Sequence, residues 1–294
     1  MLSREAEAII AEMKARPKGP LPSLEEERSG WEAYARTLKL PEGSLVSGVS
    51  LNGVPCEWVE RAESDGLIIM LVHGGGFSSG SPRTHRQHAA RLAEATGARV
   101  LVPDYALAPE EPFPAGLDDI VAVYAALAEQ GTEPQDMVLL GDSSGGGLAL
   151  AALLKLREVG APMPRALVLQ SPWVDLTLSG ASHQTNGQHP NPSGEELSRA
   201  AAWYAPANRH SEPLISPIFA DLGGLPPMLV QVGGHEVLLD DSVQLAERAE
   251  AAGVAVTLQV APGLWHVYQH SDCPEARDAI EEVATFINRV APGA

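Results

Sequence analysis

Residues 137–147, MVLLGDSSGGG, carry an apolar run that passes through Gly-Asp-Ser-Ser-Gly directly into an alanine-rich segment. This order is typical of a buried strand that turns sharply into a helix, with Ser143 at the tip of the turn. Gly141 and Gly145 flank the serine, where larger side chains would collide. The turn would lift the Ser143 hydroxyl above the carboxyl edge of a sheet and aim the first helix amides at the same point. Ser143 is therefore a candidate nucleophile.

A glycine run upstream offers the donors that such a nucleophile requires. Residues 67–73, LIIMLVH, are typical of a buried strand, and Gly-Gly-Gly-Phe follows it. Three consecutive glycines cost conformational entropy, so they indicate that main-chain amides approach a bound group closely. We predict that the amides of Gly75, Gly76 and Ser144 form an oxyanion hole. A phosphate-binding loop is the alternative, but no Gly-Lys-Ser/Thr follows and no dinucleotide fingerprint is present.

Several motifs follow one another along the chain, namely HGGGF at 73–77, PDYALAPE at 103–110, FPA at 113–115, GDSSGG at 141–146 and GLWH at 263–266. Together they resemble the hormone-sensitive-lipase-like branch of the α/β-hydrolases, the bacterial family IV esterases. The resemblance covers nearly all of the chain after about residue 45. Three positions depart from the family's pattern. Ala106 stands where Arg is usual, Ser144 where Ala is common, and Glu236 where the acid motif usually has Asp.

The other members of a serine triad are expected downstream of Ser143, because in this fold they follow in the order serine, acid, histidine. Residues 228–232, MLVQV, are typical of a buried strand, which leads into Gly-Gly-His-Glu at 233–236. Residues 257–260 are typical of a further strand, followed by a Pro-Gly turn and His266. We predict that His266 is the general base.

The family resemblance assigns the acid of the triad to Glu236. In the family an Asp heads an Asp-Pro-Leu-x-Asp segment, and an alignment without gaps puts Glu236 at its head and Asp240 at its second acid. Glu236 would accept a hydrogen bond from His266 and stabilise the imidazolium form. Two alternatives remain open. Asp240 could be the acid instead, or Glu236 could cap the helix whose start is marked by Asp240, Asp241 and Ser242.

Other polar residues of these segments are predicted to have structural roles. His73 is expected to brace the glycine loop, and Asp142 to tie down the serine turn or that loop through hydrogen bonds. His183, His189 and His210 have no acidic neighbours at catalytic spacing, so we expect them on the surface.

The order of segments predicts an α/β fold even without the motifs. Apolar runs occur at 67–72, 99–103, 137–140, 166–170, 228–232 and 254–260. They alternate with helix-like segments near 84–96, 116–130, 144–159, 241–252 and 276–290. Such alternation is typical of a mainly parallel sheet with helices on both faces. Residues 44–50 and 54–60, separated by Leu-Asn-Gly, predict an added hairpin, which makes eight strands in all.

Two segments fall outside this alternation and resemble the helical cap of the family. Residues 1–40 hold two amphipathic helix patterns, with apolar stripes at Ala6, Ile9, Ile10, Met13 and at Trp31, Tyr34, Ala35, Leu38. The second segment, 177–217, begins with a polar run and holds several prolines. We therefore expect an N-terminal cap segment at 1–43, a hydrolase domain formed by 44–176 and 218–294, and a second cap segment at 177–217.

The two cap segments would narrow the entrance to the site and supply apolar walls for an acyl chain. The candidate wall residues are Trp31, Phe77, Trp173, Trp203 and Tyr204. The alternative is that each of these aromatic side chains packs in the core or at an interface, which is the commoner role at helical spacing.

Composition narrows the class of protein and its partners. The 294 residues can bury one large core, and 38 acidic against 20 basic residues give a net charge of −18. Such a charge repels nucleic acid and anionic lipid surfaces. Cys56 and Cys273 show no metal-ligand spacing and are expected to be reduced thiols. The N-terminus lacks a secretory pattern and no apolar run reaches membrane-spanning length, so we expect a cytoplasmic protein.

These observations predict a serine carboxylesterase that acts through an acyl-enzyme, without a metal or an organic cofactor. The family resemblance implies short- to medium-chain acyl esters as substrates and allows a homodimer that pairs through the last strand. Two alternatives remain open. An amidase or formamidase could use the same triad, and a non-catalytic ligand receptor could use the same fold.

Overall fold

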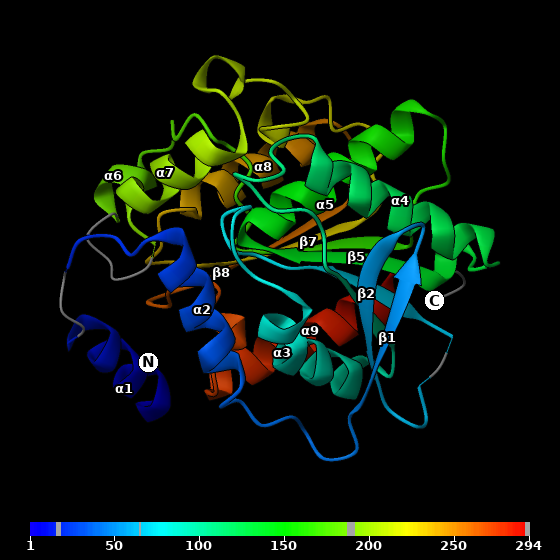
Figure 1. Cartoon of the computed structure of the whole chain (residues 1–294), viewed down its shortest axis with the longest axis horizontal. Coiled ribbons are helices and arrows are strands. Elements are labelled where there is room, and N and C mark those ends of the chain that lie inside the picture. The colour runs from blue at the N-terminus through cyan, green and yellow to red at the C-terminus, as the bar shows by residue number, and fades with distance from the viewer. Residues whose placement is uncertain (16–18, 65, 187–191, 292–294) are drawn as a thin grey trace.

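The computed structural model describes residues 1–15, 19–64, 66–186 and 192–291. A single eight-stranded sheet crosses the molecule in the order β1-β2-β4-β3-β5-β6-β7-β8 (Figure 1). Its strands are β1 (Leu45–Leu51), β2 (Val54–Glu60), β3 (Ile68–Val72), β4 (Arg99–Pro103), β5 (Met137–Asp142), β6 (Ala166–Gln170), β7 (Met228–Gly233) and β8 (Val256–Ala261). β1, β2 and β4 pair antiparallel, and all other neighbours pair parallel. The predicted fold class, hairpin and number of strands are therefore confirmed.

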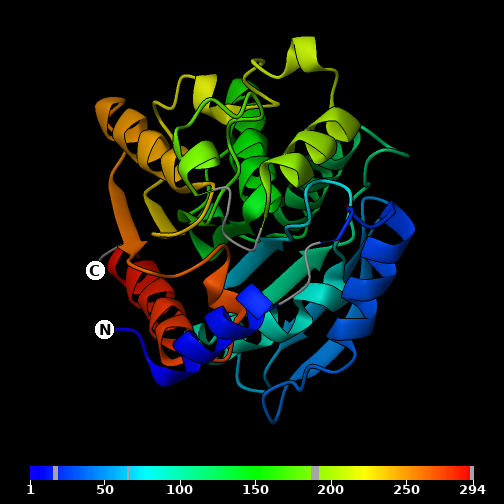
Figure 2. The same ribbon diagram turned by 90° about the vertical axis from the view of Figure 1, so that its left-hand side faces the viewer.

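Helices cover both faces of the sheet, as Figures 1 and 2 show. One face carries α4 (Ala115–Glu129), α5 (Ser143–Glu158) and α8 (Leu239–Ala251), and the other carries α3 (Pro82–Thr96) and α9 (Pro274–Arg289). The strands divide their side chains between these layers. In β3, Met70 and Val72 pack with the first layer, whereas Ile69 and Leu71 pack with the second. Every residue of β3 is buried, as expected for a parallel strand between two helical layers.

The remaining elements lie before β1 or between β6 and β7, apart from two short turns. The helices are α1 (Arg4–Ala15), α2 (Leu24–Ala35), α6 (Ser182–Thr185) and α7 (Gly194–Tyr204). The 3-10 turns are η1 (Pro134–Asp136), η2 (Ala207–Arg209), η3 (Pro217–Phe219) and η4 (Tyr268–His270).

The two N-terminal helices are anchored differently. α1 lies beside α9 (Figure 2) and buries Ala6 and Met13 in a cluster that also contains Trp265 and Tyr268. α2 has no buried residue, and Trp31 and Tyr34 are 41% and 66% exposed. Of the two predicted apolar stripes, only the first is packed into the protein.

One predicted surface residue is buried. His183 in α6 lies with its Nε2 atom 2.9 Å from Asp241 Oδ1, and both side chains are buried. The prediction that His183 lies on the surface is wrong, because the chain folds back to bring α6 over the start of α8. His210 is half-buried, with Nε2 2.9 Å from the Ala205 carbonyl, and His189 lies outside the described residues.

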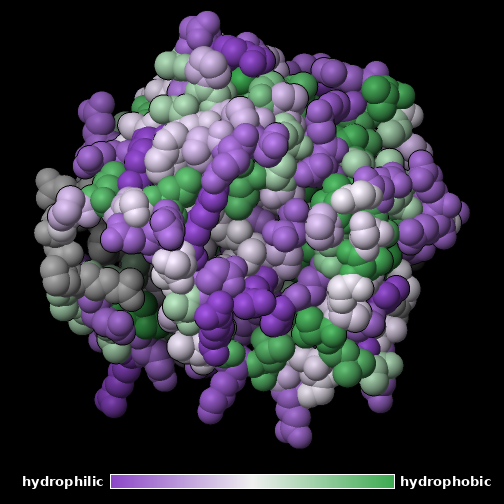
Figure 3. Space-filling model, viewed as in Figure 1, coloured by the Kyte–Doolittle hydropathy of each residue, from purple (hydrophilic) through white to green (hydrophobic). Residues whose placement is uncertain are grey.

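The surface is largely polar on the face shown in Figure 3. Hydrophilic side chains cover much of the face seen in Figure 3, with hydrophobic patches between them. Among the described residues, no helix combines the length and the apolar composition that crossing a membrane requires. Cys56 and Cys273 are both buried free thiols.

Candidate active site

The turn between β5 and α5 presents Ser143 at the carboxyl edge of the sheet. Its φ is +51°, a left-handed conformation that is costly for a residue with a side chain. The flanking glycines make that turn sterically feasible. A Cβ atom at Gly141 would collide with the carbonyl group of Gly145, and one at Gly145 would collide with that of Val72.

The structure brings Ser143, His266 and Glu236 together. His266 Nε2 lies 3.0 Å from Ser143 Oγ, and His266 Nδ1 lies 2.8 Å from Glu236 Oε1. The side chain of Glu236 is fully buried, and that of His266 is 8% exposed. If Nδ1 donates its proton to Glu236, the Nε2 lone pair faces the Ser143 hydroxyl and can accept its proton.

The other acid of this segment points elsewhere. Asp240 Oδ2 accepts a hydrogen bond from the Ser182 amide at 2.9 Å, and the Asp240 amide donates to Ser182 Oγ at 3.0 Å. Asp240 therefore attaches α6 to the start of α8. The carboxylate that bonds to His266 is that of Glu236.

Ser171, directly after β6, was missed by the sequence analysis. Its hydroxyl donates to Glu236 Oε2 at 2.8 Å and accepts from the Val267 amide at 3.1 Å. The Gly233 amide donates to the same Glu236 oxygen at 2.8 Å. Both oxygens of Glu236 are thus bonded, and Ser171 links the acid to the segment that carries His266. The only sequence signal for Ser171 was its position after a buried strand. β6 pairs parallel with β5, so both strands end at the same edge of the sheet.

The glycine loop lies directly against the serine turn. Its Gly74 amide donates to Asp142 Oδ1 at 3.0 Å, and the Phe77 amide donates to Ser144 Oγ at 3.1 Å. The expectation that Asp142 ties down this loop is confirmed. The hydroxyl of Ser144, which replaces a common alanine, provides a second tie.

The amides predicted to form the oxyanion hole lie in this loop and in the first turn of α5. Gly75 and Gly76 have φ of +129° and +61°. Within the described ranges, neither of their amides donates to a protein acceptor. Ser144 is in the first turn of α5, where helix amides have no acceptor within the helix. These donors are therefore free to bind a developing anion.

Three more residues at this site share the strained conformation of Ser143. Phe77, Ser171 and Val267 have φ of +61°, +49° and +52°. Each is a residue with a side chain in the left-handed region, which costs about 1–2 kcal/mol. The surrounding hydrogen bonds hold these turns in place.

The predicted wall residues divide into buried and exposed ones. Phe77, Trp173 and Tyr204 are all at most 4% exposed and belong to the main core. The Phe77 ring lies 3.9 Å from that of Tyr204 and 5.3 Å from that of Trp173, between centroids. Trp203 is half-buried under the Arg199 guanidinium, and Trp31 is largely exposed.

Histidines surround the acid that precedes the serine. Burial disfavours the charge of Asp142, but His85 and His270 offset this effect, so the pKa of Asp142 is lowered. Burial lowers the pKa of His73 and of His270 to about 3, so both rings are neutral at pH 7. His73 braces the glycine loop as predicted. Its ring stacks on that of Tyr105, with centroids 4.2 Å apart, and its Nδ1 atom lies 2.9 Å from the Gly74 carbonyl oxygen.

Polar contacts attach α2 to the glycine loop and to α7. Arg28 Nε donates to the Ser78 carbonyl at 2.7 Å, and its guanidinium pairs with Glu110 at 2.8 Å. Glu27 accepts from Ser79 Oγ at 2.9 Å and pairs with Arg199 of α7 at 2.8 Å. One exposed helix thus connects two segments that are far apart in sequence.

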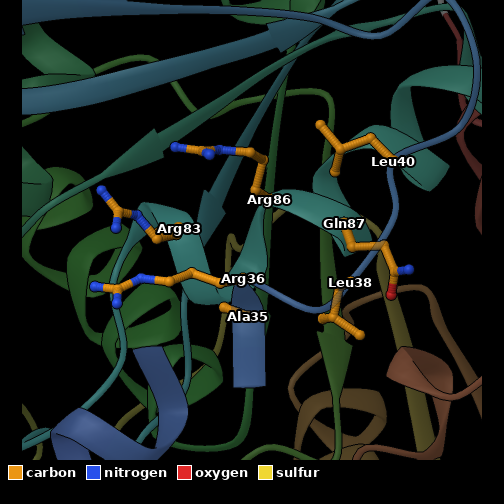
Figure 4. A pocket seen from close by; sticks show the side chains of 7 residues that line it. All are labelled: Ala35, Arg36, Leu38, Leu40, Arg83, Arg86 and Gln87. Carbon is orange, nitrogen blue, oxygen red and sulfur yellow. The ribbon is translucent and has the colours of Figure 1, made fainter. Parts of the chain in front are cut away.

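A separate groove of about 390 Å³ lies between the end of α2 and α3 (Figure 4). Arg36, Arg83 and Arg86 line one side of it, and Leu38 and Leu40 lie on the other. Its lining includes no residue of the predicted site.

Comparisons with known proteins identify the family of the chain. A family model described as the alpha/beta hydrolase fold matches residues 69–270. An acetyl-hydrolase of Streptomyces hygroscopicus is 43% identical over 265 residues, which are 89% of this chain and 87% of that protein. An esterase of Acinetobacter venetianus is 41% identical, with coverage of 82% and 81%.

Solved structures give the same result. A crystal structure of an esterase from the bacterial hormone-sensitive lipase family has a TM-score of 0.93 at 40% identity, covering 99% of each chain. A crystal structure of EstE5 that was soaked with p-nitrophenyl butyrate has a TM-score of 0.93 at 38% identity, covering 98% of this chain and 99% of that one.

Proposed function

The chain belongs to the bacterial hormone-sensitive-lipase-like esterases of the α/β-hydrolase family and is a carboxylesterase; from this premise we propose that Ser143, His266 and Glu236 hydrolyse short- to medium-chain acyl esters through an acyl-enzyme. One observation carries the assignment of residues. The contacts of 3.0 Å between Ser143 and His266 and of 2.8 Å between His266 and Glu236 join nucleophile, base and acid in one hydrogen-bonded chain.

Acylation begins when His266 Nε2 removes the proton of the Ser143 hydroxyl as Oγ attacks the ester carbonyl carbon. The carbonyl oxygen becomes an oxyanion, which the amides of Gly75, Gly76 and Ser144 stabilise. Glu236 stabilises the imidazolium that forms. His266 then gives its proton to the leaving alcohol oxygen, the carbon–oxygen bond breaks, and the acyl group remains on Ser143.

Deacylation repeats the same steps with water as the nucleophile. His266 removes a proton from water, whose oxygen attacks the acyl carbon, and the second oxyanion occupies the same amides. Proton return to Ser143 Oγ releases the carboxylic acid and restores the enzyme. Each step uses groups that this chain supplies.

The preference for short and medium acyl chains is supported by the tight packing next to Ser143. The Trp173 amide donates to the Ser143 carbonyl at 2.9 Å, and Phe77 is bonded to Ser144, so these aromatic residues lie beside the nucleophile. The Tyr204 ring stacks on that of Phe77, so the three aromatic side chains form one buried cluster there. We keep them as candidate acyl-pocket walls, with Trp31 and Trp203 as candidates at the rim.

A homodimer that pairs through β8 also belongs to this proposal. β8 is the last strand of the sheet, and Val260 on it is 41% exposed. Light scattering should give twice the chain mass of 31.0 kDa. A mass equal to that of one chain at micromolar concentration would refute this arrangement.

The experiment that tests the function is a series of p-nitrophenyl esters from acetate to laurate, assayed with the wild type and with Ser143→Ala. We expect maximal kcat/KM at or below about eight carbons and a loss of about 10⁶-fold in kcat for the variant. Ser29→Ala, which alters an exposed serine of α2, is the matched control. Matched p-nitroanilides, hydrolysed faster than the esters, would instead indicate an amidase.

A further inference from the structure

A cluster of histidines next to the Ser143 turn is not used by the proposed reaction. Its rings lie around the buried carboxylate of Asp142, and successive ring centroids are 4.1–5.3 Å apart in the order His73, His85, His270 and His88. Several of their nitrogen atoms are buried without a hydrogen-bond partner in the part of the chain that the structure describes, namely His73 Nε2, His88 Nδ1 and His270 Nε2. Such orphaned atoms call for an explanation.

Three members of this cluster converge on one point. One ligand atom each from His85, Asp142 and His270 lies within 4.8 Å of the other two. His85 Nε2 is 3.3 Å from Asp142 Oδ2, and His270 Nε2 is 4.0 Å from the same oxygen. Both distances exceed the roughly 2.8 Å of a charge-assisted hydrogen bond. The shorter one matches the ~3.4 Å that separates two ligands around a tetrahedral Zn²⁺ with bonds of 2.0–2.1 Å, and the longer one would have to shorten by about 0.6 Å when an ion binds.

The hydrogen bonds of Thr84 indicate which nitrogen of His85 has a free lone pair. Thr84 Oγ1 contacts the Ser81 amide at 2.9 Å, the Ser81 carbonyl at 2.8 Å and His85 Nδ1 at 2.9 Å. A hydroxyl donates once and accepts twice, so all three contacts are hydrogen bonds only if Nδ1 carries a proton. In a neutral ring the Nε2 lone pair then accepts a long hydrogen bond from the Gly74 amide, at 3.3 Å, and lies beside the Asp142 carboxylate. This edge of the ring is therefore electron-rich and can bind a cation. The same Nδ1 contact would orient a metal-bound imidazole.

His270 supplies both the third ligand and the access route. Its Nε2 atom faces Asp142 and has no hydrogen-bond partner among the described residues. Its side chain is 28% exposed, whereas those of His85 and Asp142 are 2% and 4% exposed. An ion could therefore reach the site from the His270 side, with movement of few side chains.

We propose that His85, Asp142 and His270 form a binding site for a borderline divalent transition-metal ion such as Zn²⁺, with one position left for water. Two imidazoles and one carboxylate favour Zn²⁺ over Mg²⁺ or Ca²⁺, which prefer oxygen ligands only. The alternative to a metal ion between His85 Nε2 and the Asp142 carboxylate is a proton on that nitrogen. A bound ion would connect η4 to the end of β5, and so would stiffen the segment that carries His266 relative to the one that carries Ser143.

The test measures metal content and does not depend on the triad. Metal-free wild type is equilibrated with ZnCl₂ near pH 7.5 and dialysed against metal-free buffer, and zinc per chain is measured. We expect one retained Zn²⁺ in the wild type and binding at least ~100-fold weaker in His270→Gln, which removes an imidazole from a partly exposed position. Substitution with Co²⁺ should give intense visible ligand-field absorption in the wild type, as a four-coordinate site with nitrogen ligands does, and not in the variant.

Two controls keep the outcome decisive. His210→Gln, which alters a histidine outside the cluster, should retain one Zn²⁺. His270→Gln should keep wild-type esterase activity without metal, which shows that it folds. If the wild type retains no zinc, a proton is the only cation of this site and the proposal is wrong. Equal zinc retention by wild type and His270→Gln would also overturn it.

Discussion

The edge of the sheet and the helices attached beside it are held by different interactions. At the edge, Ser171 donates to Glu236, and His266 links Glu236 to Ser143; all four side chains are buried, and the hydrogen bonds are 2.8–3.0 Å long. By contrast α2 buries no side chain and is held by ion pairs such as Arg28 with Glu110, whose side chains are 31% and 59% exposed. Buried networks restrict geometry, whereas exposed pairs contribute little stability. The edge is therefore suited to fixing the positions of the reacting groups, whereas α2 is held more loosely.

After the loss of Ser143 itself, the largest expected effect comes from the acid at the sheet edge. Glu236→Gln keeps the shape of the side chain but removes the charge that stabilises the His266 imidazolium, so we expect kcat to fall about 10⁴-fold. Asp240→Asn alters the neighbouring acid, which bonds to Ser182, and should change kcat less than about threefold. Steady-state kinetics on p-nitrophenyl butyrate compare the two. A larger loss in Asp240→Asn would transfer the acid role to Asp240.

Acid should destabilise the sheet edge, next to which His73 lies, and the attached helix α2 in different pH ranges. The folded-state pKa of His73 is lowered to about 3 by burial, so the unfolded chain binds its proton first as the pH falls. Stability is therefore lost between about pH 6.5 and pH 3, at up to ~1.4 kcal/mol per pH unit for each such histidine. The pKa of Glu110 is lowered by its bond to Arg28, so its small contribution is lost only below about pH 4.5.

Urea unfolding from pH 7.5 to pH 4.5 checks this difference. The midpoint should begin to fall near pH 6.5 in the wild type and in Glu110→Gln alike. A urea midpoint that stays constant down to pH 4.5 would contradict the conclusion that His73 is buried in its neutral form.

A smaller effect is expected at Ser171, which we propose as a positioning residue. Ser171→Ala removes the hydroxyl that bonds Glu236 and Val267, so kcat should fall about 10-fold with little change in KM. Ser171→Gly removes the same hydroxyl but relieves the positive φ, and should be more stable than the alanine variant by about 1 kcal/mol. Equal activity of these two variants, with unequal melting temperatures, would separate hydrogen bonding from strain. A wild-type kcat in both would exclude the positioning role.

The smallest effect is expected at the attached helix. Glu27→Gln weakens the pair with Arg199 and the bond from Ser79, and should reduce stability by at most about 1 kcal/mol. We expect unchanged kcat on acetate esters and an altered ratio between octanoate and acetate, because α2 moves more freely. Thermal unfolding and the two substrates measure this change. A tenfold loss on acetate would show that α2 takes part in fixing the reaction geometry.

The sequence predicted what short local patterns encode. The strand-turn-helix pattern around Ser143 and the alternation of apolar runs with helices specified the sheet, because both depend on neighbours in the chain. The contacts of Ser171 were not predictable, because a lone serine after a strand carries no spacing signal. The exposure of Tyr34 and the burial of His183 also depend on how distant segments pack. Helical spacing led to the opposite expectation for Tyr34, and the lack of acidic neighbours in the sequence led to the opposite expectation for His183.

The four strained residues of the site have a consequence for protein engineering. Phe77, Ser143, Ser171 and Val267 all adopt backbone angles that glycine tolerates best. At Ser143, whose small side chain serves turnover more than packing, a screen for heat resistance that ignores turnover should therefore favour glycine, and the enriched variant should melt later and lose activity. At Phe77 the loss of a buried ring would outweigh the relief of strain. Thermostabilising libraries for this scaffold are better directed at the outer helices, where a gain in rigidity leaves the chemistry alone.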